Sequence, residues 1–172
     1  MIDLSFFGAN SVLRLYVQFR VMQLRDGVNY PLGTFWTDRT VTKIDPANVY
    51  FFSPGLRDFK KSIVKGSFCA WIDIDKRELP EFYRDPSLIV DTGHGYHCYW
   101  LLNDFCYPEE LSQVLTRLSV FYKSDPKVKD PTRFMRWPES FNQKFDPPYF
   151  CKVLHQDKKS RYDFDDLVPL QG

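Results

Sequence analysis

An apolar run that ends in two carboxylates constrains the fold of this chain more than any other feature. Residues 68–75 read FCAWIDID. Side chains alternate between the two faces of a sheet along an extended strand, so Trp71, Asp73 and Asp75 share one face. Their carboxylates then project from one surface, with the Cα atoms roughly 6.5–7 Å apart. The pattern predicts a buried strand whose end carries an acidic pair.

This acidic pair admits two interpretations. Two unpaired carboxylates at that spacing repel each other, and a divalent cation between them relieves the repulsion. Mg²⁺ and Mn²⁺ prefer oxygen ligands, and two such ions about 3.5–4 Å apart stabilise phosphoryl transfer. In the alternative interpretation the strand ends in solvent, and Lys76 and Arg77 pair with the two acids.

A glycine-containing turn with histidines follows. In TGHGYHCYWLL, residues 92–102, Gly93 and Gly95 bracket a turn, and His97 lies on the strand that leaves it. The imidazole and the backbone N–H groups of the turn can bind phosphate oxygens. His97 is otherwise an ordinary sheet histidine, or a zinc ligand together with His94, although the helical spacing and cysteine partners typical of zinc sites are missing.

A third cluster lies in DPTRFMRWPESFNQK. It supplies one carboxylate, two arginines, an amide and a lysine: Asp130, Arg133, Arg136, Asn142 and Lys144. A triphosphate needs cations to offset its charge, and its metal ions need carboxylate ligands. The alternative is an exposed loop held by salt bridges.

Strands outnumber helices in the expected secondary structure. An amphipathic helix is predicted over 108–123, because Pro108 and two glutamates suit a first turn and apolar residues recur every three or four positions. The acidic tail, SRYDFDDLVPL, is predicted to form a short helix or turn. Strands are predicted at 34–43, at 48–57 running into a Pro-Gly turn, within 61–75, and as a hairpin over 87–102. This order favours an α+β fold, a mixed sheet with helices on one face.

Composition limits the class of partner. The 172 residues are 44% hydrophobic and carry a formal net charge of +1, which suits one folded domain without a uniformly basic surface. A polyanionic partner must therefore be held by local cation clusters or through metal ions. Four cysteines without a CxxC pair, and no signal peptide, favour reduced thiols in a cytoplasmic protein. No apolar run approaches the ~18 residues that would span a membrane.

The order of the three motifs resembles the archaeo-eukaryotic primase superfamily, above all its primase-polymerases and the RepB-type primases of plasmids and phages. The motifs are DxD at 73–75, G-x-H followed by YW at 95–100, and D-x-x-R-x-x-R-x-P-x-x-x-N-x-K at 130–144. The resemblance covers roughly residues 48–144. The sequence departs from the family where Gly93 and Gly95 replace a basic residue and a serine, and where Glu139 replaces a glycine.

The resemblance implies a fold and an activity. The fold is an RRM-like mixed or antiparallel sheet with flanking helices, plus an N-terminal α/β module, in a single domain of residues 1–172. The module takes about residues 1–60 and the catalytic part about 61–172. The activity is template-directed nucleotidyl transfer from dNTPs or NTPs with two metal ions, and de novo primer synthesis stays open.

Site residues also follow from the resemblance. The ligands of two Mg²⁺ or Mn²⁺ ions would be Asp73, Asp75 and Asp130. The residues that contact the nucleotide would be His97, Arg136, Lys144 and, near nucleotide or template, Arg57. Expected partners are a single-stranded or primed DNA template, the nucleotide, and a helicase or other domains of a longer polypeptide. Trp71, Tyr99 and Trp137 either stack on bases or belong to the core.

Two other functions fit a similar sheet. A replication-initiator endonuclease of the HUH type needs His-hydrophobe-His on one strand and a nucleophilic tyrosine, whereas this chain has HGYH. A non-catalytic RRM-type module would bind RNA through aromatic residues on its sheet, where carboxylates have no use.

Overall fold

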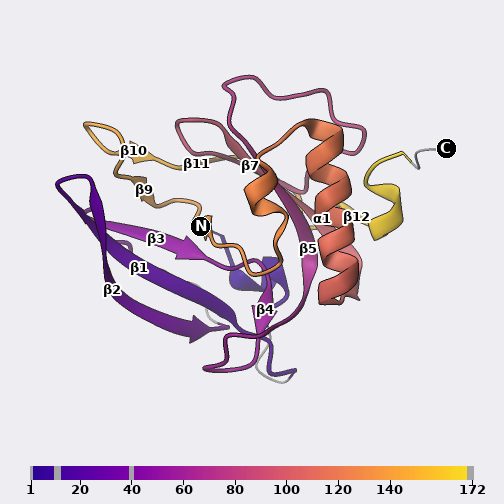
Figure 1. Cartoon of the computed structure of the whole chain (residues 1–172), viewed down its shortest axis with the longest axis horizontal. Coiled ribbons are helices and arrows are strands. Elements are labelled where there is room, and N and C mark those ends of the chain that lie inside the picture. Colours follow the sequence, from indigo (N-terminus) through magenta and orange to yellow (C-terminus); the bar gives the residue numbers. More distant parts are fainter. Residues whose placement is uncertain (1, 10–12, 39–40, 170–172) are drawn as a thin grey trace.

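The computed structural model describes residues 2–9, 13–38 and 41–169, and most of its strands form two sheets (Figure 1). One sheet has the order β2-β1-β3-β8, and the larger one has the order β11-β6-β7-β5-β4 with β12 beside β7. Only the β12–β7 pairing in these sheets is parallel. The prediction of an α+β fold with a mixed, largely antiparallel sheet is confirmed.

The first sheet is built mainly from the N-terminal third of the chain. Its elements are β1 (Val17–Arg25), β2 (Val28–Thr37), β3 (Asn48–Phe52) and β8 (Met135–Arg136). Among the described residues before position 60, the helical element is a single 3₁₀ turn, η1 (Leu4–Phe7). The N-terminal module therefore consists mostly of strands, and β8 returns to it from late in the chain.

The second sheet carries the acidic pair and the histidine motif, whereas Arg136 of the third motif lies on β8 of the first sheet. Its strands are β4 (Leu56–Arg57), β5 (Val64–Ile74), β6 (Leu88–Asp91), β7 (Tyr96–Cys106), β11 (Lys152–Gln156) and β12 (Arg161–Tyr162). Short elements complete the chain: η2 (Pro126–Lys129), β9 (Phe141–Asn142), β10 (Tyr149–Phe150) and η3 (Phe164–Asp166). The predicted hairpin over 87–102 is β6 and β7, and the predicted acidic tail is η3.

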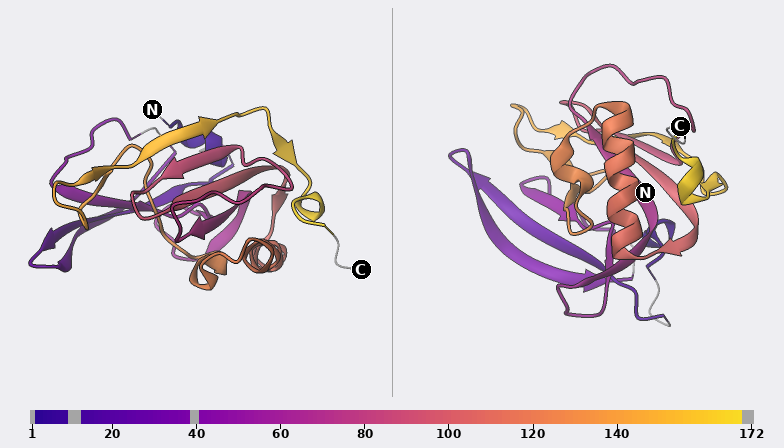
Figure 2. Two further views of the ribbon diagram at one scale, coloured as in Figure 1. Left: turned by 90° about the horizontal axis from the view of Figure 1, so that it is seen from above. Right: turned by 45° about the vertical axis from the view of Figure 1, so that its right-hand side comes forward.

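The predicted helix is α1 (Pro108–Tyr122), the α-helix of the described part of the chain. It ends where Lys123 takes a left-handed conformation with φ 50°. Its buried face, formed by Leu111, Val114, Leu115 and Leu118, packs against β5, so α1 covers one side of the second sheet (Figure 2). No helix among the described residues is long and apolar enough to cross a membrane.

One strand prediction was wrong in its bounds. The strand expected at 34–43 is β2, which begins at Val28 and ends at Thr37; positions 39 and 40 of the expected range lie outside the described residues. Its hairpin with β1 turns at Asp26 and Gly27, both with positive φ, a pair of residues typical of two-residue hairpin turns. The strand expected within 48–57 is β3, which leads into the predicted bend at Pro54 and Gly55, and β4 follows that bend.

The largest aromatic side chains fill the core. Trp71, Tyr99 and Trp137 are at most 1% exposed, and the Trp71 indole donates a hydrogen bond to the Val128 carbonyl at 3.0 Å. Buried rings cannot stack on bases, so of the two interpretations of these aromatics the core one is correct.

Candidate active site

Strand register brings the acidic pair and the histidine together. Residue 73 on β5 lies directly opposite residue 97 on the antiparallel strand β7, so both side chains leave the same face of the sheet. The His97 Nε2 atom lies 3.7 Å from Asp73 Oδ2. Its other ring nitrogen lies 3.5 Å from the Tyr99 hydroxyl, which helps to fix the orientation of the imidazole.

These residues line a pocket of about 340 Å³, which we call the acidic pocket. Its walls come from the end of β5, the glycine turn, β7, β8 and the segment after β9. The lining residues are Asp73, Asp75, Thr92, His94, His97, Arg136, Asn142 and Lys144. Five of the seven site residues expected from the sequence therefore meet in one cavity.

The two carboxylates differ in their electrostatics. Burial favours the neutral form of Asp73, but the neighbouring His97 and the charges of Arg133 and Arg136 outweigh it and hold the Asp73 pKa below its usual value. The pKa of Asp75 is raised by partial burial and by repulsion from Asp73 and Asp125. The residues around Asp75 therefore do not fully neutralise the negative charge of its ionised carboxylate.

This charge distribution fits a hard divalent cation. Mg²⁺ commonly binds proteins through one or two carboxylates and takes its other oxygens from water and substrate phosphates. Asp73 and Asp75 provide such a pair. Across the described ranges, no group of three or more His, Cys, Asp or Glu side chains is arranged to hold a metal ion by itself. The donor set therefore suits an ion that is shared with a phosphate-bearing ligand.

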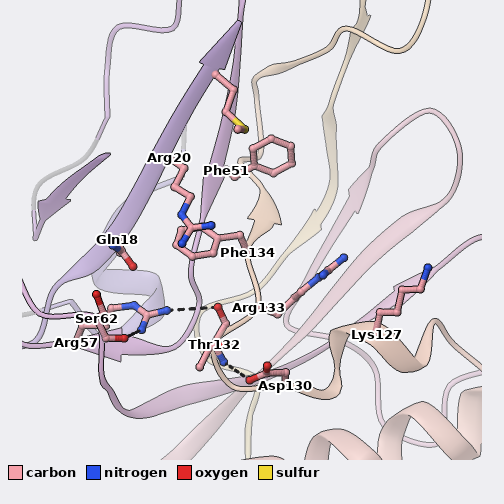
Figure 3. Close-up of a pocket in the computed structure, with 11 residues that line it drawn as sticks. Gln18, Arg20, Phe51, Arg57, Ser62, Lys127, Asp130, Thr132, Arg133 and Phe134 are labelled. Carbon is pink, nitrogen blue, oxygen red and sulfur yellow. Dashed lines mark hydrogen bonds between the residues drawn. The ribbon is translucent and has the colours of Figure 1, made fainter. Parts of the chain in front are cut away.

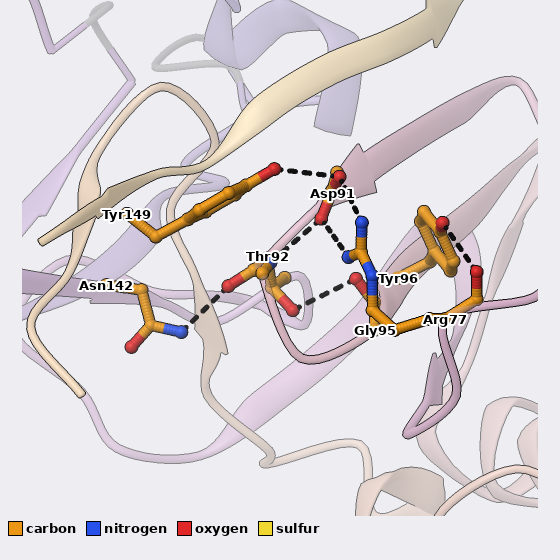
Figure 4. Close-up of polar contacts among 8 residues, drawn as sticks. Arg77, Asp91, Thr92, Gly95, Tyr96, Asn142 and Tyr149 are labelled. Carbon is orange, nitrogen blue, oxygen red and sulfur yellow. Dashed lines mark hydrogen bonds and ion pairs between the residues drawn. The ribbon is translucent and has the colours of Figure 1, made fainter. Parts of the chain in front are cut away.

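The glycine turn sits unusually close to the strand that bears the acids. A Cβ on Gly95 would overlap the Ile74 carbonyl oxygen and would lie 2.8 Å from its carbon. Gly93 adopts φ +91°, a region that other residues rarely enter. The Asn142 amide donates to the Thr92 carbonyl oxygen at 2.8 Å, which ties the turn to the segment that carries Lys144 (Figure 4).

Two cations, Arg136 and Lys144, also line the acidic pocket. Arg136 is 9% exposed, and burial lowers its pKa. Its guanidinium lies 5.1 Å from the centroid of the Phe51 ring and donates to the Phe141 carbonyl oxygen at 3.5 Å. With Lys144, it adds positive charge to the pocket that holds Asp73 and Asp75, as a bound polyphosphate requires.

Asp130 does not join the acidic pair, contrary to the expectation of three converging carboxylates. It follows η2, and its carboxylate accepts a hydrogen bond from the Thr132 backbone N–H at 2.8 Å. Besides Asp73, the carboxylate whose negative charge acts on Asp75 is Asp125, which precedes η2. The short 3₁₀ turn thus separates the two acids and directs Asp130 elsewhere.

Asp130 and Arg57 line a second cavity of about 480 Å³, the cationic pocket (Figure 3). It contains four cations and one carboxylate: Arg20, Arg57, Lys127, Arg133 and Asp130. Gln18, Met22, Phe51, Ser62, Thr132 and Phe134 complete it. Phe51 lies at the boundary of the two pockets, because its ring lines the cationic pocket and also contacts Arg136 of the acidic pocket.

Arg57 is a buried cation that has no carboxylate within salt-bridge distance among the residues that the structure describes. Its side chain donates to Ser53 Oγ at 3.2 Å and to the Ser62 and Thr132 carbonyl oxygens, while its Nε has no partner. Burial and the like charge of Arg20 lower its pKa to about 10. Arg20 itself stacks on Phe134, 4.0 Å from the ring centroid. Such uncompensated positive charge favours an anionic ligand.

Several pocket residues were not predicted from the sequence. Arg20 belongs to no motif, and Thr92 begins the glycine-turn motif without an assigned role; that each lines a pocket depends on strand pairing, which single-sequence patterns do not reveal. His94 was visible in the glycine turn, and its ring packs on Phe145 with centroids 4.6 Å apart. It precedes β7, which begins at Tyr96, so the two histidines do not share a strand as the HUH arrangement needs.

The fold has known counterparts. It is similar to the AEP domain of the primase-polymerase PrimPol of cyanophage S-2L, with a TM-score of 0.68 and 16% identity over 90% of this chain and 89% of that one. It is also similar to the catalytic domain of the primase RepB′ in complex with initiator DNA, with a TM-score of 0.61 and 15% identity over 95% and 89% of the two chains.

A further structure of the primase RepB′ gives the same TM-score and identity, with 58% of that chain covered. No family model and no curated protein matches the sequence. The comparisons therefore define the fold alone. The chain has the fold of archaeo-eukaryotic primase catalytic domains, as the order of its motifs predicted.

Proposed function

We propose that this chain is a primase-polymerase catalytic domain, which joins nucleotides from dNTPs or NTPs on a DNA template. The observation that carries the proposal is the acidic pocket: a carboxylate pair, His97, the buried Arg136 and the exposed Lys144 meet there, in a fold shared with primase-polymerase domains. Carboxylates beside cations suit a metal-bound triphosphate.

The reaction needs a 3′-hydroxyl oxygen to bond to the α-phosphorus while the bond to the β,γ-diphosphate breaks and pyrophosphate leaves. Asp73 and Asp75 would hold Mg²⁺ or Mn²⁺. A bound ion of this kind would neutralise negative charge on the reacting phosphate. His97 would donate a hydrogen bond to a phosphate oxygen. Arg136 and Lys144 would offset the triphosphate charge, and pre-positioned cations lose little energy to reorganisation during the reaction.

The cationic pocket would hold a DNA strand beside the nucleotide. Phosphate contacts from arginine and lysine set the position of a strand without reading its sequence. Arg20, Arg57 and Lys127 offer such contacts next to the acidic pocket. The RepB′ catalytic domain, which was solved with initiator DNA, supports a DNA partner. Arg57 is accordingly assigned to the strand rather than to the incoming nucleotide.

Primer extension tests the proposal. Wild-type protein, Asp73→Asn and Asp75→Asn would be incubated with a labelled primed template, dNTPs or NTPs, and Mg²⁺ or Mn²⁺. We expect elongated product from the wild type and none from either variant, because an amide binds divalent cations far more weakly than a carboxylate. Asp165→Asn, which changes an exposed acid of η3, is the matched control.

Two outcomes would refute the proposal: no product from folded wild-type protein with any nucleotide and metal, or undiminished product from Asp73→Asn. Strand nicking without nucleotides would favour the endonuclease, and nucleic-acid binding without incorporation would favour the non-catalytic module. An unprimed template in the same assay decides whether the chain starts primers.

A further inference from the structure

A hydrogen-bonded network centred on Asp91 lies just outside the acidic pocket (Figure 4). Asp91 ends β6 and is 6% exposed. Its carboxylate accepts two hydrogen bonds from Arg77, at 2.6 and 3.0 Å. It also accepts one from the Gly93 backbone N–H at 2.8 Å and one from the Tyr149 hydroxyl at 2.9 Å. One side chain therefore joins four segments of the chain.

Each partner of Asp91 adjoins a different wall of the acidic pocket. Arg77 lies two residues after Asp75, and its carbonyl oxygen accepts a hydrogen bond from Tyr96 at the start of β7. Gly93 stands between the two pocket residues of the turn. Tyr149 lies on β10, whose partner strand β9 contains Asn142. The network thus reaches the acidic strand end, the glycine turn and the Lys144 segment together.

None of Arg77, Asp91 and Tyr149 lines the pocket, so the network can affect a bound ligand only through the walls that it holds. The Arg77 side chain is 53% exposed, and an ion pair with an exposed member adds little to global stability. Its two parallel bonds do fix direction, because a guanidinium and a carboxylate match in plane and spacing. The network is therefore better suited to orientation than to holding the fold together.

We propose that Asp91 is a positioning residue, which acts through Arg77, Gly93 and Tyr149 to hold the three walls of the acidic pocket in the geometry that binds a metal–nucleotide complex. The inference deepens the proposed function and rests on it. Residues that orient metal ligands from outside the first contact layer typically change metal affinity or activity by about 10- to 100-fold when altered. The same range is expected for Asp91→Asn, which keeps the side-chain size and removes the charge.

The first test compares kinetics and metal binding. For Asp91→Asn we expect kcat/KM for the nucleotide to fall, and the Mn²⁺ concentration for half-saturation to rise, by about 10- to 100-fold. Arg77→Met should have a similar effect, and the double variant should be no worse than the more damaged single variant, because residues that act as a unit are non-additive. The matched control is Asp165→Asn, which breaks an exposed Arg–Asp pair with Arg117 on α1 and should stay within twofold of wild type.

The second test needs no enzymatic activity. Hydrogen–deuterium exchange of Asp91→Asn should show lost protection at residues 92–97 and 142–150, with α1 unchanged. An active wild type whose Asp91→Asn variant keeps its Mn²⁺ affinity, its kcat/KM and its exchange pattern would overturn the inference. Uniform loss of protection, α1 included, would overturn it too, because Asp91 would then support the whole fold. An inactive wild type with localised loss of protection would refute the proposed function and leave the network standing.

Discussion

Replacing Gly95 by alanine should push the glycine turn away from the strand that carries the acidic pair. An added Cβ would overlap the Ile74 carbonyl oxygen and would lie 2.8 Å from the Ile74 carbonyl carbon and 3.1 Å from the Lys76 nitrogen. Ordinary Cβ contacts begin at 3.4 Å, so the carbon alone must move by at least 0.6 Å, and the oxygen by more. The neighbours are backbone atoms, which cannot rotate aside as a side chain can.

This displacement has a calculable consequence. A shift of about 1 Å between His97 and the carboxylates would cost roughly 100-fold in activity, the penalty typical of misplacing a reacting group by that distance. Overpacking a closely packed contact also destabilises by about 1–3 kcal/mol. For a chain of this size, that lowers Tm by about 2–12 °C.

Primer extension and thermal unfolding measure the two effects in parallel. Gly33→Ala is the matched control, because nothing lies within 4 Å of a Cβ built at that exposed position and its φ is not positive. We expect Gly33→Ala to behave as wild type in both assays. A Gly95→Ala variant with wild-type Tm and activity would refute the close approach of turn and strand on which the site geometry depends.

Three further predictions concern charge. Asp75→Asn should raise Tm at pH 7 while abolishing incorporation, because the raised pKa of Asp75 means that its ionised form opposes folding. The stability present when Asp75 is protonated is lost as pH rises through its folded pKa. A gain in Tm that persists at pH 3 would therefore count against this cause. His97→Ala should raise KM for the nucleotide, and an unchanged KM in steady-state kinetics would remove His97 from the nucleotide site. Arg20→Ala should weaken DNA binding and reduce the slope of log K against log salt concentration by about 1, whereas an unchanged slope in fluorescence anisotropy would place the strand elsewhere.

Local periodicity predicted the face of each functional strand but not the register between strands. Alternation in WIDID and in YHCYW separates the side chains of each strand correctly. That Asp73 lies opposite His97 depends on how the two strands align, and the close packing of Gly95 on Ile74 sets this alignment. The motif order supplied the right fold because the resemblance carried that long-range information.

The two errors of consequence arose where local signals compete. The strand expected from residue 34 begins at Val28 instead, because Pro31 and Gly33 lie inside β2 and the turn is at Asp26 and Gly27. Asp130 was grouped with the acidic pair on its place in a motif. Its actual position depends on the path of η2 and on a hydrogen bond from Thr132, and neither leaves a periodic signal in the sequence.

The central claim is that Asp73 and Asp75 together hold a divalent cation next to a nucleotide. Electron paramagnetic resonance of Mn²⁺, titrated into the protein with a non-reacting dNTP analogue, measures this without any turnover. We predict saturable binding to the wild type that Asp73→Asn and Asp75→Asn each remove and that Asp165→Asn leaves unchanged. Equal Mn²⁺ affinity in all four proteins would contradict the account.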